Sequence, residues 1–123
     1  MPRLFATLIA LAATITSAQA MTVAEFLAKA DALKSKGVMA AMSPDVGVLR
    51  NEMKTVSTAY RADIDTAQKA EKPAHSCPPP KGKGAVSSDD IMAEFTAIPA
   101  AQRGRVSVKD AFYAMMKKRY PCK

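Results

Sequence analysis

Residues 43–70 read SPDVGVLRNEMKTVSTAYRADIDTAQKA. Ser43 is a favourable N-cap, and Pro44 suits the first helical position, where its missing N–H leaves no bond unmade. Apolar residues then recur every three or four positions, at Val46, Leu49, Met53, Val56, Tyr60, Ile64 and Ala67. This spacing predicts one long amphipathic helix that ends before Pro73. We expect its stripe to pack inside its own domain, although the stripe also leaves a coiled-coil partner, and hence a homodimer, open.

Three shorter helices are expected around the long one, and no stretch alternates convincingly as a strand would. Each shorter helix starts with a Ser or Thr that an acidic residue follows three positions later, which is the spacing of a capping box. The pairs are Thr22 with Glu25, Ser87 with Asp90, and Ser107 with Asp110. Residues 73–86 are rich in Pro and Gly and form a loop between two helical halves. The sequence therefore predicts an all-α fold, a small single-domain bundle of about four helices over residues 21–123.

The first twenty residues have the features of a secretory signal peptide. Arg3 is followed by an uncharged, mostly apolar run over residues 4–15, and Ala18-Gln19-Ala20 is an A-x-A cleavage site. Cleavage after Ala20 would start the mature chain at Met21, in the periplasm and without a stable membrane anchor. Two alternatives are an uncleaved N-terminal anchor and a cytosolic protein that starts at Met21.

The chain has two cysteines, Cys77 and Cys122. In a small exported domain, two cysteines are most simply one disulfide, and a bundle of this size gains much from a covalent link. Free thiols, a redox pair or metal ligands are the alternatives, but there is no C-x-x-C spacing. We therefore expect one disulfide that ties the loop after the long helix to the end of the last helix.

Positive charge is concentrated in the second half. The chain has a formal net charge of +7, and residues 77–123 hold nine basic and four acidic residues. An acidic protein surface would be steered toward this half, whereas nucleic acid is a poor partner for an exported protein without an aromatic stacking surface. The candidate partner-binding residues are Lys81, Lys83, Arg103 and Arg105, in the loop and near the last helix. The alternative is a solvated basic face without a partner.

Residues for catalysis or metal binding are sparse. His75 is the only histidine, and there is no phosphate-binding loop, nucleophile elbow or metalloprotease helix. The closest methionine groups, Met39 with Met42 and Met115 with Met116, are expected to fill the core rather than to bind copper. We therefore expect no cofactor, no metal and no enzymatic activity.

A family resemblance rests on residues 76–122. Ser76-Cys77-Pro78-Pro79-Pro80 is followed by a capped helix, by Ile98-Pro99, by a last helix with Ala111, and by Arg119-Tyr120-Pro121-Cys122. This pattern resembles that of the Rap/Tai group of type VI secretion immunity proteins. The resemblance implies an exported helical protein that binds a secreted peptidoglycan amidase effector and occludes its active site. The alternative is a non-catalytic periplasmic protein of the stress, chaperone or envelope-associated kind.

Overall fold

Four α-helices and one short 3-10 helix make up the fold in this computed structural model, which describes residues 20–84 and 86–123. The elements in chain order are α1 (Val23–Lys36), η1 (Gly37–Met42), α2 (Pro44–Lys69), α3 (Ser88–Ala97) and α4 (Val108–Arg119). Within the described ranges there is no strand, only an isolated bridge between Thr22 and Ser107. The predicted all-α fold with one disulfide is confirmed. The predicted signal peptide lies outside the described residues, apart from its last residue, Ala20.

The helices begin where the local sequence predicts. Thr22 and Glu25 form a complete capping box, since the Thr22 N–H donates to the Glu25 side chain at 3.1 Å and the Glu25 N–H donates to the Thr22 side chain at 3.2 Å. Ser87 and Asp90 form a second complete box, and the side chains of Ser43 and Ser107 cap α2 and α4. These caps satisfy backbone donors that would otherwise have no partner in the first helical turn.

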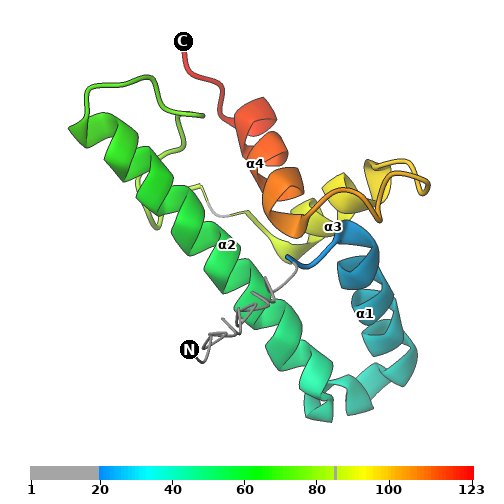
Figure 1. The fold of residues 1–123 in the computed structure, drawn as a ribbon. Helices are drawn as coiled ribbons and strands as arrows, with labels where there is room; N and C mark the ends of the chain where they lie inside the picture. Colours follow the sequence, from blue (N-terminus) through cyan, green and yellow to red (C-terminus); the bar gives the residue numbers. More distant parts are fainter. Residues whose placement is uncertain (1–19, 85) are drawn as a thin grey trace, which may run out of the picture.

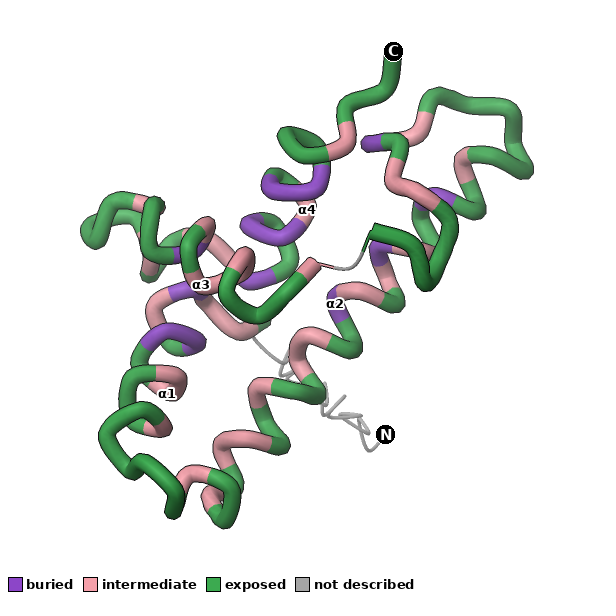
Figure 2. The backbone as a smooth tube through the Cα atoms, turned by 180° about the vertical axis from the view of Figure 1, so that it is seen from behind, coloured by how far each residue is buried: buried purple, intermediate pink, exposed green. Residues whose placement is uncertain are grey.

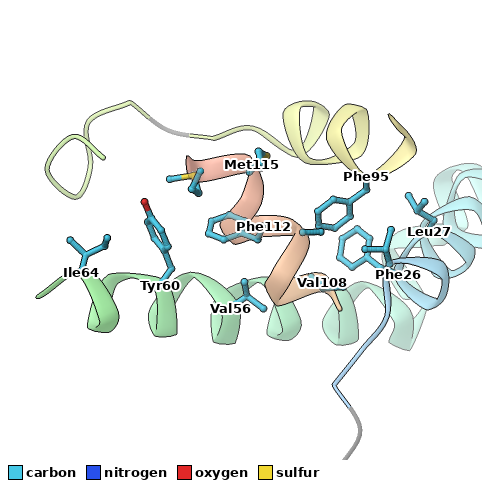
Figure 3. Packing of buried hydrophobic residues seen from close by; sticks show 12 residues of the cluster. Phe26, Leu27, Val56, Tyr60, Ile64, Phe95, Val108, Phe112 and Met115 are labelled. Carbon is cyan, nitrogen blue, oxygen red and sulfur yellow. The ribbon is translucent and has the colours of Figure 1, made fainter. Parts of the chain in front are cut away.

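Helices α1 and α2 form a V that is joined by η1, and α3 and α4 fill its open side (Figure 1). The buried residues of α2 are Val56, Tyr60 and Ile64, so the centre of the predicted stripe does pack inside its own domain. Figure 3 shows Tyr60 facing Phe112 of α4, and their rings lie 5.6 Å apart, edge to face. Phe26 of α1 and Phe95 of α3 make a second edge-to-face pair at 5.3 Å. Aromatic pairs in this geometry add to the free energy gained by burying the rings.

The starts of α1 and α4 are joined through their backbones. The Val23 N–H donates to the Val106 carbonyl, and the Val108 N–H donates to the Met21 carbonyl, both at 2.9 Å. The Ala24 N–H donates to the Arg103 carbonyl at 3.0 Å. The first turn of α1 thus obtains hydrogen-bond acceptors from the connection between α3 and α4.

The prediction that Met39 and Met42 fill the core is wrong. Their side chains are 59% and 80% exposed, and Val38 beside them is 94% exposed. Gly37 ends α1 with a φ of +56°, and the following residues cross the end of the helix pair as η1. No other element of the described chain reaches this end of the V (Figure 2), so nothing covers these side chains. Met115 and Met116 of α4 are buried, as predicted.

Candidate functional site

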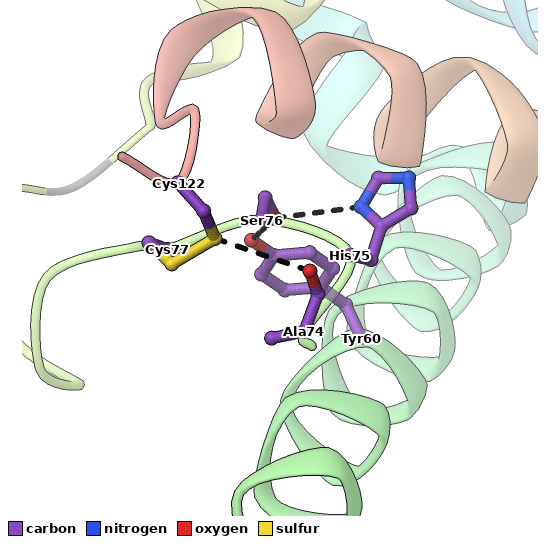
Figure 4. The surroundings of a disulfide bond; sticks show 6 residues. All are labelled: Tyr60, Ala74, His75, Ser76, Cys77 and Cys122. Atoms are coloured by element: carbon purple, nitrogen blue, oxygen red, sulfur yellow. Dashed lines mark hydrogen bonds between the residues drawn. A yellow bond between two sulfur atoms is a disulfide. The ribbon is translucent and has the colours of Figure 1, made fainter. Parts of the chain in front are cut away.

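The disulfide lies in the loop that follows α2 (Figure 4). Cys77 and Cys122 are bonded with a Cα–Cα distance of 4.9 Å, as the sequence predicts. The Cys77 N–H also donates to the Tyr120 carbonyl at 2.8 Å. The two Cys-containing segments, residues 76–80 and 119–122, are far apart in the sequence but meet in one structural unit.

The far end of this loop rests on the same C-terminal segment. The Tyr120 hydroxyl donates to the Gly84 carbonyl at 3.1 Å, and the Lys83 N–H donates to the Pro80 carbonyl at 3.0 Å. Gly84 has a φ of +68°, and a Cβ atom there would lie 2.7 Å from Cγ of Pro79. A side chain at Gly84 would thus be strained and would collide with the loop itself. We call residues 77–84 the anchored loop.

Helix α2 provides the third attachment of the anchored loop. A terminal nitrogen of the Arg61 guanidinium donates to the Pro79 carbonyl at 3.0 Å. Arg61 is half-buried, whereas Lys81 and Lys83 at the outer part of the loop are exposed. The loop backbone is therefore held at three points, by α2 and by the segment after α4, while its two lysines remain accessible.

Buried polar groups lie under the disulfide. The Ser76 hydroxyl is fully buried and hydrogen-bonds with the Tyr60 hydroxyl. His75 Nδ1 lies 3.4 Å from Oγ of Ser76. Sγ of Cys122 lies 3.9 Å from the Ala74 carbonyl oxygen, but a disulfide sulfur has no proton to donate, so this is a packing contact. Because the Ser76 hydroxyl is shielded from solvent, this Ser and His pair connects the loop to the core and presents no accessible nucleophile.

A second hydroxyl links α4 to α2 beside this cluster. The Tyr113 hydroxyl donates to a carboxylate oxygen of Asp63 at 2.6 Å. Burial of the phenol, together with that hydrogen bond, raises the pKa of Tyr113. The rings of His75 and Tyr113 lie 5.4 Å apart, so His75 packs against α4.

The structure does not bring the four predicted partner-binding residues together. Lys81 and Lys83 lie on the anchored loop, whereas Arg103 and Arg105 lie in the α3–α4 connection, on the other side of α4 (Figures 1 and 2). The Arg103 guanidinium donates to the carbonyls of Ile98 and Thr96, both at 2.8 Å. Arg103 thus caps the C-terminal end of α3, and of this pair Arg105 is the exposed one.

Two cations that sequence reasoning did not select lie beside the anchored loop. Lys54 and Arg61 of α2 line a hollow of about 350 Å³ together with Lys83, and they line a second hollow of about 580 Å³ together with Lys81. We call Lys54, Arg61, Lys81 and Lys83 the basic face. The spacing of seven residues between Lys54 and Arg61 puts them on one face of α2, but their proximity to the loop depends on tertiary structure.

An apolar groove lies at the other end of α2. It measures about 370 Å³ and runs between α1, α2 and the start of α3. Its apolar lining residues are Phe26, Ala30, Leu33, Leu49, Met53, Ile91 and Met92. The predicted stripe of α2 is therefore only half-buried toward its N-terminal end.

A scan of the chain against protein-family models gave no match, and neither did searches of curated proteins and of solved structures. In residues 20–84 and 86–123, no three side chains of His, Cys, Asp or Glu are grouped as metal ligands. Over the same ranges, none of the helices combines the length and apolar character needed to cross a membrane.

Proposed function

We propose that the chain is an exported, non-catalytic inhibitor that binds a secreted peptidoglycan amidase and covers its active-site cleft. The resemblance of residues 76–122 to the Rap/Tai immunity group implies this activity. The observation that carries the proposal is the anchored loop. The Cys-Pro-Pro segment and the Tyr-Pro-Cys segment hold it together through the disulfide and the Cys77–Tyr120 hydrogen bond.

Rigidity of the anchored loop suits an inhibitor. A loop that is ordered before binding loses little conformational entropy on binding, so more of the contact energy contributes to affinity. The contacts that fix this loop come from α2 and from the segment after α4. Loops on a rigid scaffold commonly carry binding residues. Inhibition by occlusion also needs no catalytic residue of its own.

Export is part of the proposal and has two supports. A disulfide persists in an oxidising compartment such as the periplasm. The N-terminal contact to α4 uses the Met21 carbonyl, which accepts from the Val108 N–H. Removal of residues 1–20 would therefore leave this contact in place.

The test measures amidase activity on isolated peptidoglycan against increasing concentrations of oxidised residues 21–123. The enzymes to be assayed are any secreted amidases that are encoded beside the gene for this chain. We expect activity to fall to background at saturation, because an occluded cleft excludes the polymer. The bacterium's own housekeeping amidase is the control and should keep its activity. Undiminished activity of every neighbouring secreted amidase would reject the proposal.

A chaperone-like role is a second candidate, and the exposed apolar turn favours it. Val38, Met39 and Met42 present apolar surface beside the apolar groove, and such surface can bind unfolded chains. The test follows light scattering by reduced, aggregating insulin. If the role is real, the wild-type chain suppresses aggregation and the Val38→Ser/Met42→Ser variant does not. Equal suppression by both proteins, or none by the wild type, would exclude this surface as a chaperone site.

A further inference from the structure

The basic face combines cations from two segments of the chain. Lys54 and Arg61 lie two helical turns apart on α2, with Ser57 between them, and all three line both of the adjoining hollows. Lys83 completes the first hollow and Lys81 the second. One acidic residue, Asp65, lines the second hollow, so positive charge is in excess over the whole face.

The cations of this face have no intramolecular acidic partner in the part of the chain that the structure describes. Lys54, Lys81 and Lys83 take part in none of its ion pairs, and Arg61 donates to a neutral carbonyl only. The basic residues at the end of α4 differ, since Lys118 and Arg119 each lie 3.4 Å from a carboxylate oxygen of α3. The positive charges of these two residues are therefore paired with carboxylates, whereas those of the basic face are not paired within the described chain.

The first hollow is lined by both cationic and apolar side chains, and this combination indicates which class of ligand it could bind. Besides Lys54, Arg61 and Lys83, it includes apolar side chains, namely Met53, Val86, Ile91, Phe112 and Met116. A surface of cations around an apolar floor matches a peptide that carries carboxylates next to an apolar side chain. A single-stranded nucleic acid would instead use exposed aromatic rings for base stacking, and neither hollow offers one beyond the buried Tyr60 and Phe112.

We infer that the basic face binds an acidic segment of the partner protein, with carboxylates at Lys54, Arg61, Lys81 and Lys83 and an apolar side chain in the first hollow. The three attachments of the anchored loop fix the backbone of Lys81 and Lys83 before the partner arrives. The identity of the partner as the amidase rests on the proposed function, whereas the face itself is defined by this chain alone.

The first experiment compares amidase binding by two charge-reversed variants. Lys54→Glu/Lys83→Glu places carboxylates opposite those of the partner, so we expect the Kd measured by calorimetry to rise at least about tenfold. Lys117→Glu/Lys123→Glu changes the net charge equally, at exposed residues outside the face, and should leave the Kd within about twofold. Matching thermal melting curves establish that both variants fold. An equal Kd for all three proteins would overturn the basic face and leave the proposed function intact.

The second experiment needs no amidase. Its probe is a synthetic ten-residue peptide of Asp and Glu with one central Leu, which is titrated into the oxidised chain and followed by amide NMR shifts. We expect the shifts to concentrate at residues 54–61 and 81–84 and to disappear in Lys54→Glu/Lys83→Glu. If this occurs while no amidase binds, the face stands and the proposed function fails. Shifts of similar size around Lys117 and Lys123, or displacement of the peptide by an oligonucleotide, would overturn the inference.

Discussion

The two ends of α2 are stabilised in different ways. The helix has 26 residues and is therefore about 39 Å long. Toward its C-terminal end, Tyr60 and Ile64 are buried, Arg61 holds the anchored loop, and a disulfide lies alongside. Toward its N-terminal end, the neighbouring turn exposes Val38 and Met42, and the only ion pair that joins α1 to α2 in the described chain is Lys29–Asp45 at 3.4 Å.

The difference shows that apolar sequence pattern and burial are separate properties. The α2 stripe is continuous along the helix, yet only its central part is covered on all sides, by α4 and the loop before α3. Hydrogen bonds and the covalent link are concentrated around the anchored loop. The other end relies on partial apolar contact and is expected to open first under stress.

The largest expected effect comes from removing the covalent link. Closing a loop with 45 residues of sequence separation limits the unfolded chain, and its loss should cost about 4 kcal/mol of unfolding free energy. We expect Cys77→Ser/Cys122→Ser to show this loss in urea unfolding at neutral pH. Reductant should lower the urea midpoint of the wild-type chain and leave that of the variant unchanged. A variant as stable as the oxidised wild type would contradict the conclusion that the disulfide stabilises the C-terminal end of α2 more than the N-terminal end.

A smaller loss is expected from the buried hydroxyl pair. Ser76→Ala leaves the Tyr60 hydroxyl, whose side chain is 1% exposed, without its serine partner. An unsatisfied buried hydroxyl costs about 1–3 kcal/mol, whereas removal of both partners costs less. Urea unfolding should therefore find Tyr60→Phe/Ser76→Ala more stable than Ser76→Ala alone. Additive losses in this double-mutant cycle would mean that the two hydroxyls do not stabilise each other.

At the loosely packed end, one substitution is expected to stabilise. Gly47 lies in the exposed first part of α2, and a Cβ atom there meets nothing within 4 Å. Gly47→Ala should raise the unfolding free energy by about 0.5–1 kcal/mol, since alanine loses less backbone entropy in a helix. Gly84→Ala is the matched comparison and should destabilise, because its Cβ atom would collide with Pro79. Thermal melting should give a higher Tm than that of the wild type for Gly47→Ala and a lower Tm for Gly84→Ala.

The smallest expected effect is a dependence of the unfolding free energy on pH in the acidic range. Hydrogen bonds from the backbone and hydroxyl of Ser87, with the nearby Arg119, lower the pKa of Asp90. The pKa of Asp90 is lower in the folded chain than in the unfolded chain, so ionised Asp90 stabilises the fold at pH values above its ordinary pKa. This stabilisation is lost as the pH falls below about 4. Asp90→Asn should therefore lose less stability than the wild type between pH 5 and pH 2.5 in urea titrations, with Asp89→Asn as the control. Parallel curves for Asp90→Asn and the wild type would contradict the assignment.

Local features of the structure were predictable from the sequence, and long-range ones were not. The caps at Thr22, Ser43 and Ser87 depend on residues within three positions, so the helix starts could be read directly. The disulfide followed from a count of two cysteines in a chain with a leader-like N-terminus. The exposure of Met39, by contrast, arises because no helix of the described chain other than α1 and α2 packs against η1, and this depends on the tertiary structure. The role of Arg103 depends on where α3 ends, and the approach of Lys54 to Lys83 depends on how the loop folds back on α2.

The bridge between Thr22 and Ser107 also constrains the order in which the molecule can assemble. A ribosome or a secretion channel delivers the N-terminus first, but the Val23 and Ala24 N–H groups find their acceptors in residues 103–106, just before the last helix. These two hydrogen bonds can therefore form only after most of the chain has emerged. Under the proposed export, these contacts would form only on the far side of the membrane, after residue 106 has left the channel.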